Sequence, residues 1–320
     1  MYRNKCICFL IALLFGVTCL FCACGKITDE TKPTEYQLPE GIMQKEDPAD
    51  DGIINLLMIG NSYCYSYVDE LYGIAKAAGI EMRICNVYYS GCSIAQHWSW
   101  WKSGDSNYEF CTFDASGRKA EGRPIEGQGV NLAYCLSQYN WDIISLHEAV
   151  GTVRTDAEAA FIGMNNTLPE LLGYIQEQYP LSKMFWQQTW AYQVGFEQSG
   201  YQVSAVDVQT QLHENIRKMS LNVCEKYGFQ RVPSGDAWQM ARANAVIGDT
   251  LCERLSGTDF HHEGDVGGGQ YLNACVWYEV ITGQSCIGNT YRPDYDLSNE
   301  KIDVLQNAAH QAVENMKSEQ

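Results

Sequence analysis

The sequence predicts an α/β protein in which a parallel sheet carries helices on both faces. From residue 53 onward, short apolar segments typical of buried strands alternate with longer segments that have a helical apolar pattern. This alternation is typical of βαβ units stacked into a three-layer α/β/α sandwich. The expected strands cover residues 53–59, 82–89, 141–146, 183–188 and 229–233, and the expected helices cover residues 66–78, 157–178, 208–227, 268–282 and 298–317.

Composition supports one globular domain over residues 51–320. The chain has 320 residues, of which 46% are hydrophobic and 12% aromatic, enough for one sizeable core. No internal repeat or second linker interrupts the alternating segments. The formal net charge of −17 disfavours nucleic acid as a partner, because phosphate binding needs clusters of Lys and Arg.

One stretch departs from the alternation. Residues 102–130 are rich in glycine and in mixed charges, which indicates a long surface excursion that could close over a ligand.

The first residues indicate export. Arg3 and Lys5 precede an apolar run over residues 6–23, the order found in signal peptides. This end resembles a bacterial lipoprotein signal, in which Cys24 would be lipidated after cleavage behind Ala23. An uncleaved membrane helix is the alternative, since the run just reaches spanning length.

Either alternative anchors the protein to the membrane, facing the cell surface or the periplasm. Residues 1–24 are expected to form the lipoprotein signal peptide and lipobox. Residues 25–50 are acidic, contain proline and lack an apolar period, so we expect a flexible tether.

The cysteines outside the signal are spread along the chain without a repeated CxxC spacing. A zinc framework is therefore disfavoured. Export permits disulfides, but spacing alone does not give their pairing, and we expect most of these side chains to be small buried hydrophobes. They are Cys64, Cys85, Cys92, Cys111, Cys135, Cys224, Cys252, Cys275 and Cys286.

A serine lies where the first strand meets the first helix. In "LLMIGNSYCYSYVDELYGIAKAAG", residues 56–79, the apolar run breaks at Gly60, and Ser62 follows at the carboxyl end of the expected strand. Ligands of such sheets bind outside the carboxyl ends of the strands. Ser62 is either an ordinary turn residue or a nucleophile, and a nucleophile needs a base and oxyanion donors.

A base and an acid occur together near the other end of the chain. Asp259 and His262 stand three apart in "TDFHHEGD", a spacing that lets a carboxylate orient an imidazole. The alternatives are a pair of surface histidines, His261 and His262, or a metal site completed by Asp259, Glu263 and Asp265.

Taken together, these motifs resemble the SGNH hydrolase superfamily, the GDSL-like esterases and lipases. The resemblance rests on "IGNS" at 59–62, the isolated Gly91 in "YYSGCSIAQHW" and "DFHH" at 259–262, and it covers roughly residues 53–284. It is closest to a branch of uncharacterised bacterial members with Gly-Asn-Ser in the first block. It implies a flavodoxin-like parallel sheet of about five strands and no metal or other cofactor.

Carried over, the resemblance makes Ser62 the nucleophile, His262 the general base and Asp259 its orienting acid. The backbone N–H groups of Ser62 and Gly91 would stabilise the oxyanion. The superfamily usually adds a donor from an asparagine after the third strand, but "WDIISLHEAVGTVRTD" contains none. His147 is the candidate replacement; otherwise the oxyanion hole has two donors or borrows a side chain from elsewhere.

Two aromatic clusters are expected to frame a pocket. They are "AQHWSWW" at 95–101 and "FWQQTWAY" at 185–192, with His97, Trp98, Gln188 and Trp190 as candidate substrate contacts. Aromatic faces beside amides suit sugar rings, although core packing explains the same residues.

The resemblance therefore implies a serine esterase whose substrate is an acylated carbohydrate or other small ester. We expect a carbohydrate O-acetylesterase that acts through an acyl-enzyme on Ser62. The alternatives are a noncatalytic lipoprotein that binds glycans or other solutes, and an acyltransferase that uses the same serine.

The lipid anchor can be tested directly. If Cys24 is lipidated, Cys24→Ala should move the full chain from the detergent-extracted membrane fraction to an unprocessed or soluble form. Fractionation and intact mass report the change. Unchanged membrane retention together with unchanged mass would support the spanning helix instead.

Overall fold

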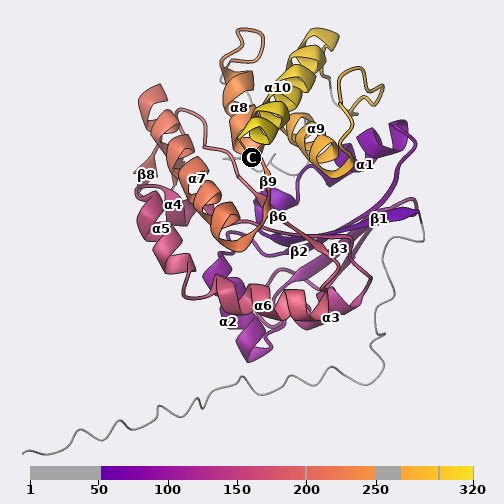
Figure 1. The fold of residues 1–320 in the computed structure, drawn as a ribbon, viewed down its shortest axis with the longest axis vertical. Helices are drawn as coiled ribbons and strands as arrows, with labels where there is room; N and C mark the ends of the chain where they lie inside the picture. Colours follow the sequence, from indigo (N-terminus) through magenta and orange to yellow (C-terminus); the bar gives the residue numbers. More distant parts are fainter. Residues whose placement is uncertain (1–51, 199, 249–267, 295, 320) are drawn as a thin grey trace, which may run out of the picture. The chain divides into compact units, whose positions relative to one another are not determined.

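The computed structural model shows one layered α/β domain (Figure 1). It describes residues 52–198, 200–248, 268–294 and 296–319. The signal and tether predicted at residues 1–50 lie outside this range. None of the helices in the described ranges is long and apolar enough to cross a membrane.

The core of the domain is a seven-stranded sheet in the order β4-β3-β2-β1-β5-β6-β9. The five consecutive strands β2-β1-β5-β6-β9 are parallel to one another. This confirms the predicted flavodoxin-like arrangement. The strands are β1 (Ile53–Gly60), β2 (Glu81–Tyr88), β3 (Glu109–Asp114), β4 (Gly117–Glu121), β5 (Ile143–Leu146), β6 (Lys183–Gln187) and β9 (Gln230–Val232). A separate two-stranded ribbon joins β7 (Glu197–Gln198) to β8 (Tyr201–Gln202).

Strand β1 is the centre of this sheet, and its sequence explains its position. Leu56, Leu57, Met58 and Ile59 follow one another without a polar residue, and each is fully buried. Alternating side chains of a strand point to opposite faces, so a continuous apolar run requires cover on both faces.

The helices provide that cover in two layers. One face carries α1 (Val68–Ala77), α8 (Ser234–Arg242), α9 (Gly269–Thr282) and α10 (Asn299–Ser318), and the other carries α2 (Ile94–Ser103), α3 (Leu132–Ser137) and α6 (Leu168–Gln178) (Figure 1). Helices α4 (Val150–Val153), α5 (Ala157–Met164) and α7 (Val206–Tyr227) pack together at one end. The predicted three-layer sandwich is thus confirmed.

Helices α9 and α10 show how burial follows sequence. Every residue of α9 from Tyr271 to Glu279 is buried, because α1, α8 and α10 surround it. Helix α10 instead buries a single stripe that includes Ile302, Leu305 and Val313. The Ser298 side chain caps its first turn by accepting a hydrogen bond from the Lys301 N–H.

The surface excursion predicted at residues 102–130 is corrected by the structure. Within it, β3 and β4 form an antiparallel hairpin, and β3 pairs with β2 to extend the sheet. The outer strand β4 consists largely of exposed charged residues, including Arg118 and Lys119, which suits an edge strand. Because it has no alternation of apolar residues, the sequence pattern did not predict it.

The helical prediction also needs correction in detail. The single helix expected over 157–178 is divided into α5 and α6, and Pro169 stands in the first turn of α6, where its missing N–H costs nothing. Helices α2, α3, α4 and α8 were not expected.

The cysteines fit the prediction of small buried side chains. Eight free cysteines occur in the described ranges, and all except the half-buried Cys224 are buried. Cys252 lies outside these ranges.

A buried charged network joins the last helix to the edge of the sheet. Arg231 on β9 is 3% exposed, and its guanidinium contacts Asp236 at 2.7 Å and Glu319 at 2.5 Å. It also donates to Gln188 Oε1 at 2.5 Å. The charge of Arg231 is therefore fully paired.

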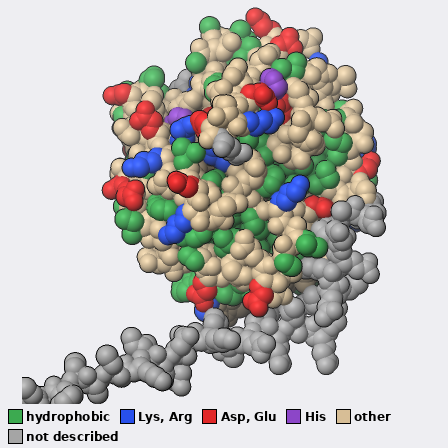
Figure 2. Space-filling model, in the orientation of Figure 1, with side chains coloured by type: hydrophobic (Ala, Val, Ile, Leu, Met, Phe, Trp, Pro, Cys, Tyr) green, Lys and Arg blue, Asp and Glu red, His purple; other side chains and the backbone are tan. Residues whose placement is uncertain are grey.

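On the face of the domain shown in Figure 2, acidic and basic side chains are interspersed among polar and apolar ones.

Candidate active site

The carboxyl ends of three neighbouring parallel strands lie level with one another in the sheet. Gly60 at the end of β1 pairs with Tyr88 at the end of β2, and Ile59 pairs with Leu146 at the end of β5. Parallel strands in this register bring their following residues together. Ser62, Gly91 and His147, far apart in the sequence, therefore follow strand ends that lie side by side.

Ser62 opens a short 3-10 helix directly after β1. This helix covers Ser62–Cys64, and extended Asn61 caps it. The Ser62 side chain is half-buried, and neither its hydroxyl nor its backbone N–H makes a hydrogen bond to any residue in the described ranges. A hydroxyl and a backbone donor that no described residue uses are thus available at the same residue.

Asn61 fixes this turn through three contacts. Its side-chain Oδ1 accepts from the Tyr63 N–H at 3.1 Å, and its Nδ2 donates to the Cys92 carbonyl at 2.9 Å. Its backbone N–H lies 3.3 Å from His147 Nε2. Asn61 therefore links the Ser62 turn to the loops that follow β2 and β5.

Gly91 occupies a tight turn after β2. The Cys92 N–H bonds to the Tyr89 carbonyl at 3.2 Å, and Gly91 between them has a left-handed φ of 67° that favours glycine. Gly91 is exposed, with open space where a side chain would be. Within the described residues its N–H has no hydrogen-bond partner, so it can donate to a ligand.

His147 packs against the backbone of the Ser62 turn. Its Nε2 lies 3.0 Å from Asn61 Oδ1, and the whole side chain is 1% exposed. Burial, together with a smaller effect of the nearby His97, lowers the pKa of His147 to about 3, so the imidazole is neutral near pH 7. The structure places His147 as a positioning residue for Asn61, and its predicted role as an oxyanion donor stays a prediction.

Glu148 adds an ionisable group to the same edge. Its carboxylate accepts from the Ala149 N–H at 2.7 Å and from the Ile94 N–H, at the start of α2, at 3.3 Å. Burial raises the pKa of Glu148 to about 7, against these two hydrogen bonds. Glu148 thereby fixes the start of α2, which follows Gly91.

Gln187 supports the turn from β6. Its Nε2 donates to the Tyr63 carbonyl at 3.0 Å, and its Oε1 accepts from the Tyr67 hydroxyl at 3.2 Å. Sequence reasoning missed the positioning roles of Asn61, Gln187 and Glu148. The only sequence feature that could have indicated them was polar residues directly after buried strands.

Two predicted substrate contacts differ from the structure because their polar atoms are enclosed. His97 is fully buried, and its Nδ1 pairs with the Tyr108 hydroxyl at 2.9 Å. Gln188 is also fully buried, between Arg231 and Asp236, and its Nε2 donates to Asp236 at 2.7 Å. These side chains stabilise the interior and do not face substrate.

The other two predicted substrate contacts are tryptophans, and both pack against neighbouring side chains. Trp190 is 1% exposed, packed between Tyr63 at 4.6 Å and Trp238 at 4.4 Å between ring centroids. Trp98 is half-buried, but its indole N–H donates to Glu170 on α6 at 2.7 Å, so it joins two helices. Trp190 thus reflects packing, the alternative that the sequence left open, whereas a substrate contact by Trp98 stays a prediction.

The predicted triad partners cannot be placed. Asp259, His261 and His262 lie outside the described residues, as does Cys24. The assignments of base, orienting acid and lipidation site therefore stay predictions.

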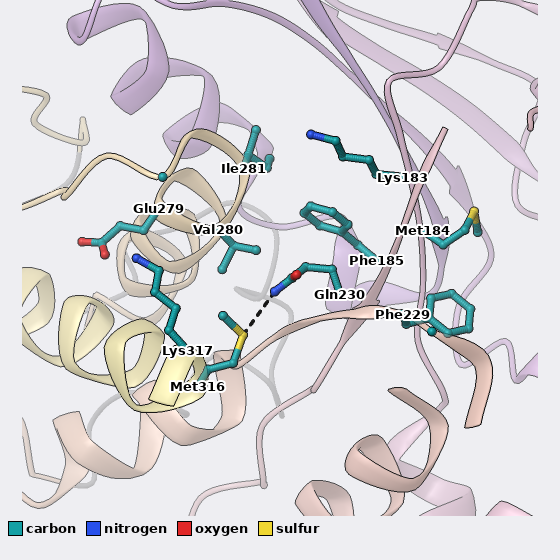
Figure 3. A pocket seen from close by; sticks show the side chains of 12 residues that line it. Lys183, Met184, Phe185, Phe229, Gln230, Glu279, Val280, Ile281, Met316 and Lys317 are labelled. Atoms are coloured by element: carbon teal, nitrogen blue, oxygen red, sulfur yellow. Dashed lines mark hydrogen bonds between the residues drawn. The ribbon is translucent and has the colours of Figure 1, made fainter. Parts of the chain in front are cut away.

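A cavity of about 560 Å³ lies at the amino ends of strands β6 and β9 (Figure 3). It is lined by the first residues of β6 and β9, including Lys183 and Gln230, and by the ends of α9 and α10. Because these are the amino ends of the parallel strands, this cavity is separate from Ser62.

The family model DUF4886, described as a domain of unknown function, matches residues 55–312. The chain belongs to the DUF4886 family. No curated protein matches it.

Solved structures support the family assignment and the fold. A DUF4886 family protein from Bacteroides uniformis is 27% identical, with a TM-score of 0.68 over 82% of this chain and 95% of that chain. More distant matches are a catalytic mutant of an acetylxylan esterase from Geobacillus stearothermophilus (14% identity, TM-score 0.44, 72% of this chain and 94% of that one) and a GDSL-like lipase from Bacteroides thetaiotaomicron (11%, 0.39, 72% and 89%).

The contact between Gly60 and His147 gives a testable prediction. A Cβ atom at Gly60 would lie 1.9 Å from His147 Cε1, and the buried ring has little room to move. Gly60→Ala should therefore lower the free energy of unfolding by about 2 kcal/mol or more, measured by thermal and denaturant unfolding.

The matched control is Gly163→Ala in α5, where a Cβ atom meets nothing within 4 Å. It should leave stability unchanged or slightly higher. Equal stability of Gly60→Ala and the wild type would show that the Gly60–His147 contact does not constrain this turn.

Proposed function

We propose that this protein is a serine esterase that removes O-acetyl groups from carbohydrate through an acyl-enzyme on Ser62. The observation that carries the proposal is the arrangement at the carboxyl ends of β1 and β2. There, an unbonded hydroxyl on Ser62 stands with two backbone N–H groups, of Ser62 and Gly91, that no described residue uses. Acyl transfer requires donors of this kind to stabilise its oxyanion.

The proposed chemistry follows from these groups. Ser62 Oγ attacks the ester carbonyl carbon and gives its proton to a base, while the Ser62 and Gly91 N–H groups stabilise the oxyanion. The bond between the acyl carbon and the sugar oxygen then breaks, and the base returns the proton to that oxygen, which leaves as a hydroxyl. A water molecule then cleaves the acyl-enzyme by the same route, which releases acetate and regenerates Ser62.

The base and its orienting acid come from the sequence resemblance. We propose His262 as the base and Asp259 as the residue that holds its tautomer. His147 is not an alternative base, because burial holds its pKa near 3 and its Nε2 already faces Asn61.

Carbohydrate is favoured by aromatic side chains beside both donors. Half-buried Tyr65 follows the Ser62 turn and packs on Tyr88, with ring centroids 4.4 Å apart. Half-buried Tyr89 precedes Gly91 and packs on Trp100 at 4.7 Å. Partly exposed rings of this kind can stack on the apolar faces of sugars.

The location remains part of the proposal. We propose an exported bacterial lipoprotein, anchored through Cys24, in which residues 25–50 hold the esterase domain away from the membrane. A substrate on extracellular or periplasmic glycan would be accessible to such an enzyme.

Replacement of the nucleophile tests the proposal. Ser62→Ala should lower kcat for 4-nitrophenyl acetate by a factor on the order of 10⁴ or more while the melting temperature stays near that of the wild type. Ser66→Ala, four residues along the same segment, is the control and should keep activity within about twofold. A folded and fully active Ser62→Ala protein would remove the proposed reaction.

The two adjacent histidines distinguish a serine triad from a metal site. His262→Ala should lose activity by a factor on the order of 10³ or more, whereas His261→Ala should stay within about tenfold of the wild type. Asp259→Asn should also impair activity, because the imidazole loses its orienting partner. Comparable losses in both histidine variants, with activity abolished by a chelator and restored by a divalent ion, would instead support the metal site.

A further inference from the structure

Arg154 is an arginine that forms no ion pair within the described part of the chain. It follows α4 and is half-buried. Within the described ranges its guanidinium forms no ion pair, and its Nε is enclosed without a hydrogen-bond acceptor. By contrast, Arg231 is paired with Asp236 and Glu319.

Two aromatic rings hold the guanidinium in place. Its central carbon lies 4.9 Å from the centroid of the Tyr201 ring and 5.9 Å from that of Tyr192. Cation–π contacts orient a guanidinium without neutralising its charge. The charge of Arg154 therefore stays available to an external anion.

The acidic side chains of Asp156 and Glu148, close to Arg154 in sequence, accept hydrogen bonds from backbone N–H groups and form no ion pair with Arg154. Asp156 caps α5 by accepting from the Glu158 and Ala159 N–H groups at 2.9 and 3.0 Å. Glu148 accepts from the N–H groups of Ala149 and Ile94. In a chain with a net charge of −17, a partly desolvated cation without a carboxylate is costly unless a ligand completes it.

The tyrosine that holds Arg154 also connects it to the candidate nucleophile. The Tyr192 ring lies 6.4 Å from the ring of Tyr63, the residue after Ser62. Burial raises the pKa of the Tyr63 phenol well above its usual value, and the positive charges of Arg242 and Arg154 oppose that rise. The charge of Arg154 thus acts on the side chain of Tyr63, the residue after Ser62. In Figure 1, α4, α7 and β8 gather at the same end of the domain.

We propose that Arg154 forms an anion subsite beside Ser62 that binds a carboxylate on the acylated sugar. The proposal rests on the esterase function and names its substrate class as O-acetylated acidic sugars. One guanidinium matches one negative charge, and its planar donors suit a planar carboxylate.

The experiment compares two substrates that differ only in charge. Acetate release is measured from O-acetylated methyl glucuronoside and from the matching O-acetylated methyl glucuronamide, whose primary amide is neutral. The wild type should prefer the acid in kcat/KM, and Arg154→Gln should reduce the acid-to-amide ratio about tenfold. Arg154→Lys should restore part of the ratio, because it keeps the charge.

Arg123→Gln is the matched control, since Arg123 is exposed in the loop after the β3–β4 hairpin. It should leave the ratio unchanged. A wild-type ratio near one, or a ratio that Arg154→Gln does not alter, would overturn the subsite. Loss on both substrates in proportion, with a lower melting temperature, would also overturn it by showing that Arg154 only supports the fold.

A binding measurement separates this inference from the esterase function. Calorimetry with unacetylated methyl glucuronoside should give an affinity that falls about tenfold in Arg154→Gln, whatever the rate of hydrolysis. Binding that depends on Arg154 in a protein that cleaves neither ester would refute the esterase and keep the subsite. Ester cleavage together with binding that is independent of Arg154 would do the reverse.

Discussion

The parallel pairing of β1 with β2 on one side and β5 on the other is the constraint on which the candidate site depends. The register sets Gly60 against Tyr88 and Ile59 against Leu146, so three loops leave the sheet at one level. Asn61 then ties these loops together by bonding to the Cys92 carbonyl and to His147. A one-residue slip in this register would turn the side chains of β1 to the opposite faces and separate these partners.

Burial determines which groups can act at this edge. His147 is enclosed and neutral near pH 7, so it can hold Asn61 without introducing a charge beside a developing oxyanion. Glu148 is enclosed as well, and its raised pKa of about 7 reflects burial opposed by two backbone donors. Ser62 and Gly91 keep unused N–H groups within the described chain, which concentrates positive electrostatic potential where acyl transfer needs it. In our substrate proposal, Arg154 adds a cation that has no ion pair within the described chain.

Much of the fold could be predicted because buried strands leave continuous apolar runs. All five parallel strands were located, and Ser62 and Gly91 follow β1 and β2 as predicted, although their catalytic roles stay predictions. The β3–β4 hairpin was missed because β4 is an exposed, charged edge strand with no apolar alternation. Gln188 was misassigned because its partner Arg231 is 43 residues away, and a single sequence gives no sign of that bond. Trp190 was misassigned because an aromatic residue after a strand looks the same whether it packs on Trp238 or meets a ligand.

The central claim is that Ser62 is an activated nucleophile, and covalent labelling tests it most directly. The folded protein would be treated with a fluorophosphonate, which reacts with serines that an adjacent base activates, and the adduct would be located by peptide mass spectrometry. The account predicts one stoichiometric adduct on Ser62, with labelling that depends on His262. An unmodified Ser62 in folded protein, or an adduct confined to another serine, would contradict it.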